Sequence, residues 1–91
     1  MSAIIIKLQG LADGRPTTVD GQYLRYCDFD AAEGRGVIYG TADPHQALMF
    51  ADVEDALAYW KQQSSLLPLR PDGRPNRPLT SYTVSLEKYP E

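Results

Sequence analysis

Hydrophobic and polar residues alternate near both ends of the chain, and this period of two predicts two strands that are each covered on one face. The first strand is expected at residues 3–9, where the inward face carries Ile4, Ile6 and Leu8. The last strand is expected at residues 81–89, where the inward face carries Tyr82, Val84 and Leu86. We expect the last strand to pair with the sheet.

Residues 41–63 form the only segment with sustained helical periodicity. Its large apolar residues recur at spacings of three and four, which places them on one stripe of a helix with Ala56 beside it. The stripe consists of Phe50, Val53, Leu57 and Trp60. We expect this stripe to be buried, whereas Tyr59 lies off it and is expected to be free to contact a partner.

Capping signals indicate where two helices begin. Asp52 is expected to cap the main helix, because acidic residues follow it in the first turn, near the positive end of the helix dipole. Asp43 followed by Pro44 is typical of a cap and a first helical residue. A short helix that continues to Leu48 is therefore expected to lead into the main one.

Two further strands are expected at residues 22–29 and 37–41, joined by a hairpin loop at residues 31–36 whose glycines can adopt positive φ. Residues 10–21 contain two Asp-Gly turns and are expected to form a loop or a wide hairpin. The strand at 22–29 has two candidate inward faces, and the pattern leaves both open. The first consists of Leu24 and Tyr26, and the second of Tyr23, Cys27 and Phe29.

These elements follow the order β-β-β-α-α-β, which predicts an α+β fold in which a single antiparallel sheet of about four strands packs on one main helix. A chain of 91 residues is expected to be one domain. A Pro/Arg-rich loop is expected at about 65–79, between the main helix and the last strand. The pattern does not determine the order of the strands within the sheet.

The composition is that of an ordinary globular protein, and no apolar run approaches the roughly 20 residues that span a bilayer. We therefore expect no membrane association and a cytoplasmic location. The formal net charge of -3 argues against broad binding to a phosphate backbone, so direct nucleic-acid binding is not expected. Cys27 is the only cysteine, which excludes an internal disulfide.

Candidate catalytic and metal-binding residues are sparse. A nucleophile needs a base within hydrogen-bond reach, and nothing in the sequence indicates that Cys27 and His45 meet. The acidic cluster of Asp28, Asp30 and Glu33 precedes a glycine, as calcium loops do, but the remaining ligand positions do not follow. We interpret this cluster as a solvated acidic hairpin, and we expect no catalytic residue, metal or cofactor.

The most distinctive segment is L-P-L-R-P-D-G-R-P-N-R-P-L, from Leu67 to Leu79. Prolines reduce the entropy that is lost when a loop is immobilised, and arginines offer bidentate hydrogen bonds to carboxylate or phosphate. Arg70, Arg74 and Arg77 are therefore candidate partner-binding residues. The alternative is a structural loop, in which the leucines hold it against the domain and acidic groups such as Asp72 neutralise the arginines.

A second candidate surface combines aromatic residues and arginine on neighbouring strands, a composition that can anchor a protein interface or stack on bases. Its residues are Tyr23, Arg25, Tyr26 and Tyr39. Tyrosines on strands are also common as half-buried packing residues, and this alternative remains open.

The pattern T-x-D-P-x-x-A-x-x-F-x-x-x-x-x-A-x-x-x-W from Thr41 to Trp60, between a strand hairpin and a closing strand, resembles small phage- and prophage-type accessory proteins, anti-CRISPR-like inhibitors among them. The resemblance implies a small, non-enzymatic protein-binding module that occupies the surface of a larger protein or nucleoprotein complex, such as a host defence complex or enzyme. Two alternatives remain open: a domain that binds a small ligand or single-stranded nucleic acid, and a homo-oligomeric structural subunit, such as a homodimer formed through an exposed strand edge.

Overall fold

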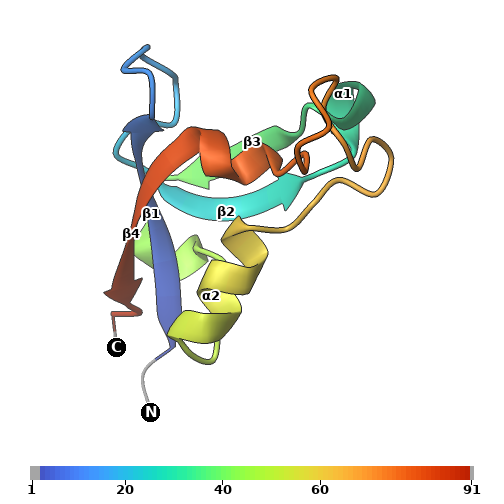
Figure 1. The fold of residues 1–91 in the computed structure, drawn as a ribbon. Helices are drawn as coiled ribbons and strands as arrows, with labels where there is room; N and C mark the ends of the chain where they lie inside the picture. The colour runs from blue at the N-terminus through green and yellow to red at the C-terminus, as the bar shows by residue number, and fades with distance from the viewer. Residues whose placement is uncertain (1–2, 91) are drawn as a thin grey trace.

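A four-stranded antiparallel sheet in the order β3-β2-β1-β4 forms one layer of the computed structural model, which describes residues 3–90 (Figure 1). The strands are β1 (Ile4–Leu11), β2 (Tyr23–Asp28), β3 (Val37–Thr41) and β4 (Tyr82–Lys88). The first and last strands of the chain lie side by side, with Ile6 opposite Leu86. The predicted pairing of the last strand with the sheet is confirmed.

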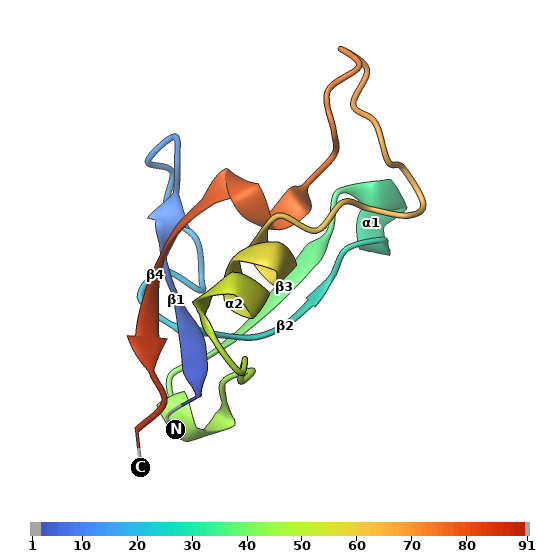
Figure 2. The same ribbon diagram turned by 60° about the horizontal axis from the view of Figure 1, so that its bottom comes forward.

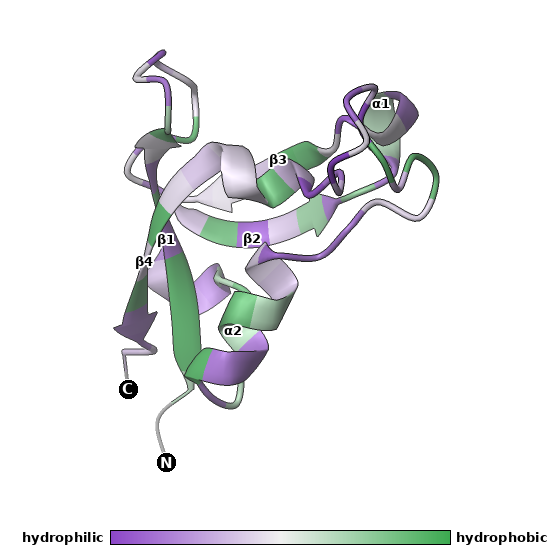
Figure 3. Ribbon diagram, in the orientation of Figure 1, coloured by the Kyte–Doolittle hydropathy of each residue, from purple (hydrophilic) through white to green (hydrophobic). Residues whose placement is uncertain are grey.

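The helix α2 (Val53–Trp60) packs on one face of this sheet, and the predicted α+β fold class is confirmed. Its expected cap is present, because the Asp52 carboxylate accepts the backbone N–H of Asp55 at 2.9 Å. Figure 3 shows hydrophobic residues along β1 where this strand lies beside α2. Within residues 3–90, none of the helices has the length and apolar composition that a bilayer span requires.

The buried side of α2 differs from the predicted stripe. Ala56 is fully buried, whereas Val53 is 45% exposed, so the prediction that Val53 is buried is wrong. Phe50 forms a β-bridge with Ile4 and precedes the helix, which begins at Val53. Phe50, Ala56 and Trp60 do lie against the core, as expected. Val53, the first residue of α2, departs from the expected stripe.

A β-bulge in β2 resolves the two candidate inward faces of this strand. The pairing with β3 shifts register between Leu24 and Tyr26, and Arg25 is the additional residue. Because of the shift, Leu24 and Cys27 are both buried, at 0% and 2% exposure. Tyr26 is 53% exposed, so neither candidate face is correct over the whole strand.

The segment before α2 fills the space between β1 and β2. It begins with the short 3-10 helix η1 (Pro44–Gln46), which the Asp43 carboxylate caps as expected by accepting the N–H of His45. Further on, Leu48 donates its backbone N–H to the Leu24 carbonyl. The strands β1 and β2 are therefore joined partly through this segment.

The hydrophobic core lies between α2 and the sheet. Its fully or nearly buried members come from β1, β2, α2 and the loops beside them: Ile6, Leu8, Leu24, Cys27, Phe29, Ala56 and Leu79. Leu79 belongs to the 3-10 helix η2 (Pro78–Ser81), which leads into β4. The end of the Pro/Arg-rich loop is thereby fixed to the core.

Candidate functional site

The Pro/Arg-rich segment between α2 and η2 forms a projecting hairpin, which Figure 2 shows extending beyond the sheet and α2. Residues 68–76 are called the arginine hairpin below. Arg70 donates its N–H to the Arg74 carbonyl at 2.8 Å, and Leu69 forms a β-bridge with Pro75. Gly73 adopts φ of +85° in the turn at the tip. The Pro/Arg-rich loop therefore has a hairpin structure of its own.

The Asp30 carboxylate holds the first part of this segment. It accepts hydrogen bonds from the backbone N–H groups of Ser65 and Leu66, at 2.8 and 3.0 Å, and from the hydroxyls of Ser64 and Ser65, at 2.9 and 2.8 Å. These bonds, the Leu66 N–H first, lower the pKa of Asp30 to about 2. Asp30 is therefore more than the solvated acid that the sequence indicates, because it anchors this segment.

Asn76 closes the base of the arginine hairpin. Its side-chain amide donates to the carbonyls of Gly34 and Leu67, at 2.6 and 2.8 Å, and its backbone N–H donates to the Pro68 carbonyl. Only 9% of Asn76 is exposed, so these bonds form largely out of contact with water. The two ends of the hairpin are thus tied to each other and to the turn between β2 and β3.

That turn, α1 (Ala31–Gly34), has left-handed backbone at Ala32 and Glu33, with φ of 51° and 60°. Each such residue costs roughly 1–2 kcal/mol when it is not glycine. The predicted positive φ of the loop glycines is confirmed at Gly34 and Gly36. A Cβ atom on Gly34 would lie 2.5 Å from the Leu67 Cβ, so the turn and the hairpin base pack closely.

The tip and sides of the arginine hairpin are open to solvent. Its arginines and the neighbouring Arg77 are exposed, and the closest acidic contact joins Arg74 Nε to Asp72 Oδ2 at 3.9 Å. Within residues 3–90, neither Arg70 nor Arg77 forms an ion pair. The alternative of a structural loop requires acidic groups that neutralise these arginines. In the part of the chain that the structure describes, such a group is present only for Arg74, at the long distance to Asp72.

Three leucines around the hairpin are exposed as well, and these are Leu66 at 63%, Leu67 at 44% and Leu69 at 53%. Leu69 therefore does not hold the loop against the domain, whereas Leu79 does, and Leu67 lies against Gly34 although it is partly exposed. A shallow hollow of about 350 Å³ lies at the hairpin base, between Arg35, Leu67 and Arg70. Apolar and cationic side chains thus share this surface.

Arg25, Tyr26 and Tyr39 come together on the face of the sheet that α2 leaves open, and they are called the tyrosine patch below. The rings of Tyr26 and Tyr39 are stacked, with centroids 5.9 Å apart and an angle of 28° between the planes. Both tyrosines are about half exposed, at 53% and 50%. The bulge in β2 makes this patch possible, because it exposes Arg25 and Tyr26 in succession.

Tyr23 is separate from the tyrosine patch. It is half-buried, its hydroxyl donates to Glu87 Oε1 at 3.4 Å, and Lys7 Nζ lies 5.8 Å from the centre of its ring. These contacts link β2, β1 and β4 on the open face of the sheet. They favour a packing role for Tyr23.

Tyr59 is half-buried and packs against the core, so the prediction that its side chain is free to contact a partner is wrong. Its ring packs against Phe29 and Phe50, with centroids 5.2 Å away in each case. Its hydroxyl accepts the Cys27 N–H at 3.2 Å, and burial raises its pKa. The spacing of Tyr59 three residues after Ala56 is the signal that could have placed it inward.

Cys27 and His45 lie in different environments. Cys27 is buried in the core, and burial raises the pKa of its thiol to about 12. His45 is exposed, 3.2 Å from Asp43, and its ring packs edge-on against Tyr89. Between residues 3 and 90, no three His, Cys, Asp or Glu side chains gather as a metal site would require.

No protein-family model, curated protein or solved structure matches this chain. The arginine hairpin and the tyrosine patch are therefore the two candidate functional surfaces of this protein.

Proposed function

We propose that this protein is a small, non-enzymatic protein-binding module, and that the arginine hairpin is its principal contact surface. The observation that carries the proposal is the contrast between the base and the tip of the hairpin. The base is fixed by the hydrogen bonds of Asp30 and Asn76, whereas Leu69, Arg70 and Arg74 along the hairpin are exposed. A segment that is ordered but not buried contributes little to the stability of the core, and loops of this kind commonly carry binding residues.

The chemistry of the hairpin favours an acidic protein surface as its partner. Arg70 and Arg77 form no ion pair within residues 3–90, so their guanidinium groups are available for bidentate bonds to carboxylates. Leu69 offers apolar contact beside them. Because the hairpin is already ordered by its base and its prolines, little entropy is lost on binding.

The tyrosine patch is a second contact surface in this proposal. Stacked, half-exposed tyrosines beside an arginine match the composition of interface hot spots. The expected partner is a larger protein or nucleoprotein complex in the cytoplasm, and the resemblance of the Thr41–Trp60 pattern to phage accessory proteins suggests a host defence complex or enzyme that the module inhibits.

Affinity capture from a host lysate, followed by mass spectrometry, tests the proposal. The triple variant Arg70→Ala, Arg74→Ala, Arg77→Ala should lose a stoichiometric partner while its melting temperature changes little. The matched control replaces three exposed cations elsewhere: Arg15→Ala, Lys61→Ala, Lys88→Ala. This control removes the same charge and should retain the partner. If both variants lose the partner equally, or neither does, the hairpin is not the contact surface.

The tyrosine patch also supports a second candidate function, the binding of single-stranded nucleic acid. Its stacked rings and Arg25 could continue a stack of bases. Salt-dependent binding of single-stranded oligonucleotides near physiological ionic strength, lost in Tyr39→Ala, would favour this function. Absence of binding even at low salt would remove it.

A further inference from the structure

The strand β4 is an outer strand of the sheet, since the order is β3-β2-β1-β4. It runs for seven residues, and neither proline nor glycine interrupts it. Proline, inward-pointing charge and a bulge are common devices that prevent pairing at an exposed edge. In β4, the charged residues are confined to the C-terminal end, at Glu87 and Lys88.

The hydrogen-bond pattern identifies which residues of β4 face outward. Tyr89 donates its N–H to the Ala3 carbonyl, so the residues of β4 that bond to β1 alternate from there: Glu87, Ser85 and Thr83. The residues between them direct their backbone groups away from β1. Both backbone groups of Tyr82 already have hydrogen-bond partners within the chain. Its N–H donates to the Leu79 carbonyl, and its carbonyl accepts a hydrogen bond from Trp60 Nε1 at 3.2 Å.

The backbone groups of three residues therefore point out from this edge, and they belong to Val84, Leu86 and Lys88. An apolar groove of about 400 Å³ runs beside them, between β4 and α2. Leu57 and Trp60 line it from α2, and Val84 and Leu86 line it from β4. Unpaired backbone and half-exposed apolar side chains thus occur together along one edge.

We propose that β4 pairs in antiparallel fashion with β4 of a second copy of this chain, about a two-fold axis at Leu86. In this register Leu86 faces Leu86 of the other copy, and Val84 faces Lys88 in both directions. Each of these opposed pairs exchanges two hydrogen bonds, so the register uses the outward N–H and C=O of all three residues. The edge is complementary to itself, as a two-fold interface requires.

The side chains of this edge also suit a second copy. A two-fold axis perpendicular to the sheet keeps both α2 helices on the same side, so the two apolar grooves adjoin across the joined strands. The antiparallel register places Glu87 opposite Ser85 and Lys88 opposite Val84, so no like charges face each other. The dimer would present two arginine hairpins, which strengthens binding to a partner with repeated sites.

Light scattering coupled to size exclusion, over a range of protein concentrations, tests this proposal with a matched pair of variants. Lys88→Pro removes an outward N–H and leaves the bonds of Glu87 and Tyr89 to β1 in place. It should weaken dimerisation by at least about 30-fold, because two symmetric bonds are lost and the proline ring obstructs the partner strand. Lys88→Ala removes the same side chain but keeps the N–H, and it should dimerise like the original chain.

Thermal unfolding at low protein concentration should show that Lys88→Pro is folded. The proposal is overturned if the original chain keeps its monomer mass of 10.1 kDa at all concentrations, or if Lys88→Pro dimerises as tightly as Lys88→Ala.

Cysteine cross-linking tests the register. In the proposed dimer, Leu86→Cys places two thiols on residues whose Cα atoms are about 5.5 Å apart, a separation that a disulfide can bridge. Mild oxidation should then give a covalent dimer, and Lys61→Cys, on the exposed end of α2, should not. Cys27 does not interfere, since it is buried. A dimer in solution that Leu86→Cys fails to cross-link would show that another surface is used.

Discussion

The Asp30 carboxylate accepts the backbone N–H of Leu66 at 3.0 Å, although 36 positions separate the two residues in the chain. This bond, with those from Ser64 and Ser65, connects the end of β2 to the segment that enters the arginine hairpin. The position of the hairpin therefore depends in part on one charged group, beside the hydrogen bonds of Asn76, and this dependence can be measured.

Acid should loosen the base of the arginine hairpin. The pKa of Asp30 is lowered from 3.8 to about 2 by its hydrogen bonds, so the anchor is fully present above pH 3.8 and is lost as the pH falls through about 2. Amide hydrogen exchange of Ser65 and Leu66 should accelerate, relative to intrinsic rates, over that range. In Asp30→Asn the fast exchange should already be present at neutral pH and the acid-dependent change should vanish.

If the protection of both amides were the same at pH 2 and pH 5 in the original chain, Asp30 would not be the anchor. The core amide of Leu8, which donates to the Gln22 carbonyl at 2.8 Å, serves as the control, since it reports global unfolding rather than the local release of the hairpin.

Alanine substitutions at two glycines should separate backbone strain from steric contact. Gly34 and Gly73 both have positive φ, at +90° and +85°, but only Gly34 has Leu67 within 2.5 Å of an added Cβ. Gly73→Ala should lower the free energy of unfolding by about 1 kcal/mol, because the strain of the left-handed backbone is its only cost. Gly34→Ala should cost roughly 2–4 kcal/mol, because Leu67 must also move.

Urea unfolding of both variants measures the difference. Equal costs would mean that Leu67 can move away from the added methyl group at no cost in stability, and that the turn and the hairpin base are not closely packed.

The Tyr59 hydroxyl should matter for stability and not for partner binding. Tyr59→Phe leaves the Cys27 N–H without its acceptor, which should cost about 1–2 kcal/mol in the free energy of unfolding. Tyr39→Phe is the matched control, because its ring is half exposed, and it should change stability by less than about 0.5 kcal/mol. Denaturant unfolding compares the two, and a cost at Tyr39 equal to that at Tyr59 would contradict this assignment.

The sequence predicts the elements well where the periodicity is local. The alternation of Ile4, Ile6 and Leu8 and the caps at Asp43 and Asp52 need only neighbouring residues, and all of them correspond to the structure. The fold class follows from the order of such elements.

What the sequence could not predict depends on contacts between distant segments. The predicted stripe extends across Phe50 as if this residue were helical, but Phe50 pairs with Ile4 before the helix begins, and Val53 at the start of α2 is exposed. The bulge at Arg25 inserts one residue into β2, so Leu24 and Cys27 face the same side of the sheet. A strict alternation of inward and outward residues cannot predict this. The anchoring of the arginine hairpin requires Asp30 to meet Leu66, and nothing in the spacing of the two indicates it.

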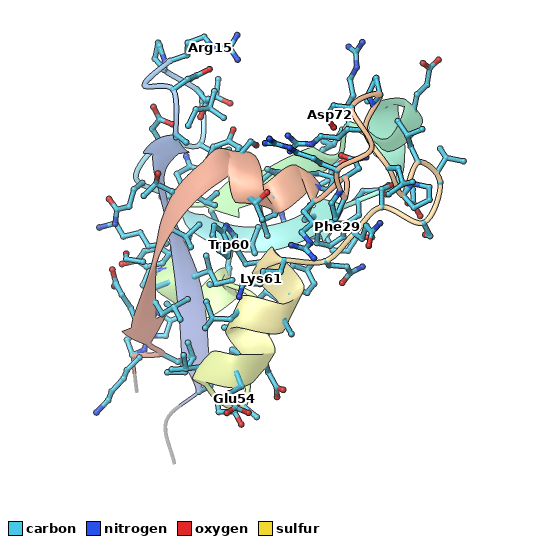
Figure 4. All side chains as sticks on the ribbon, in the orientation of Figure 1. Arg15, Phe29, Glu54, Trp60, Lys61 and Asp72 are labelled. Atoms are coloured by element: carbon cyan, nitrogen blue, oxygen red, sulfur yellow. The ribbon has the colours of Figure 1, made fainter. Side chains whose placement is uncertain are left out.

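The tetrapeptide D-G-R-P occurs twice, at Asp13–Pro16 and Asp72–Pro75, and it provides an internal control for the proposed function. Figure 4 shows Arg15 and Asp72 on two separate loops. Arg15 Nε lies 2.7 Å from Asp13, whereas Arg74 Nε lies 3.9 Å from Asp72. Both arginines are highly exposed, so each alanine variant should change stability by less than about 0.5 kcal/mol.

Partner capture should nevertheless distinguish the two variants, since only Arg74 belongs to the hairpin that Asp30 and Asn76 hold in place. Arg74→Ala should reduce the captured partner at least about tenfold, as expected for an arginine at an interface hot spot. Arg15→Ala should leave capture unchanged. Equal losses would indicate that positive charge anywhere on the surface is sufficient, in which case binding would follow net charge and would weaken uniformly as salt is added.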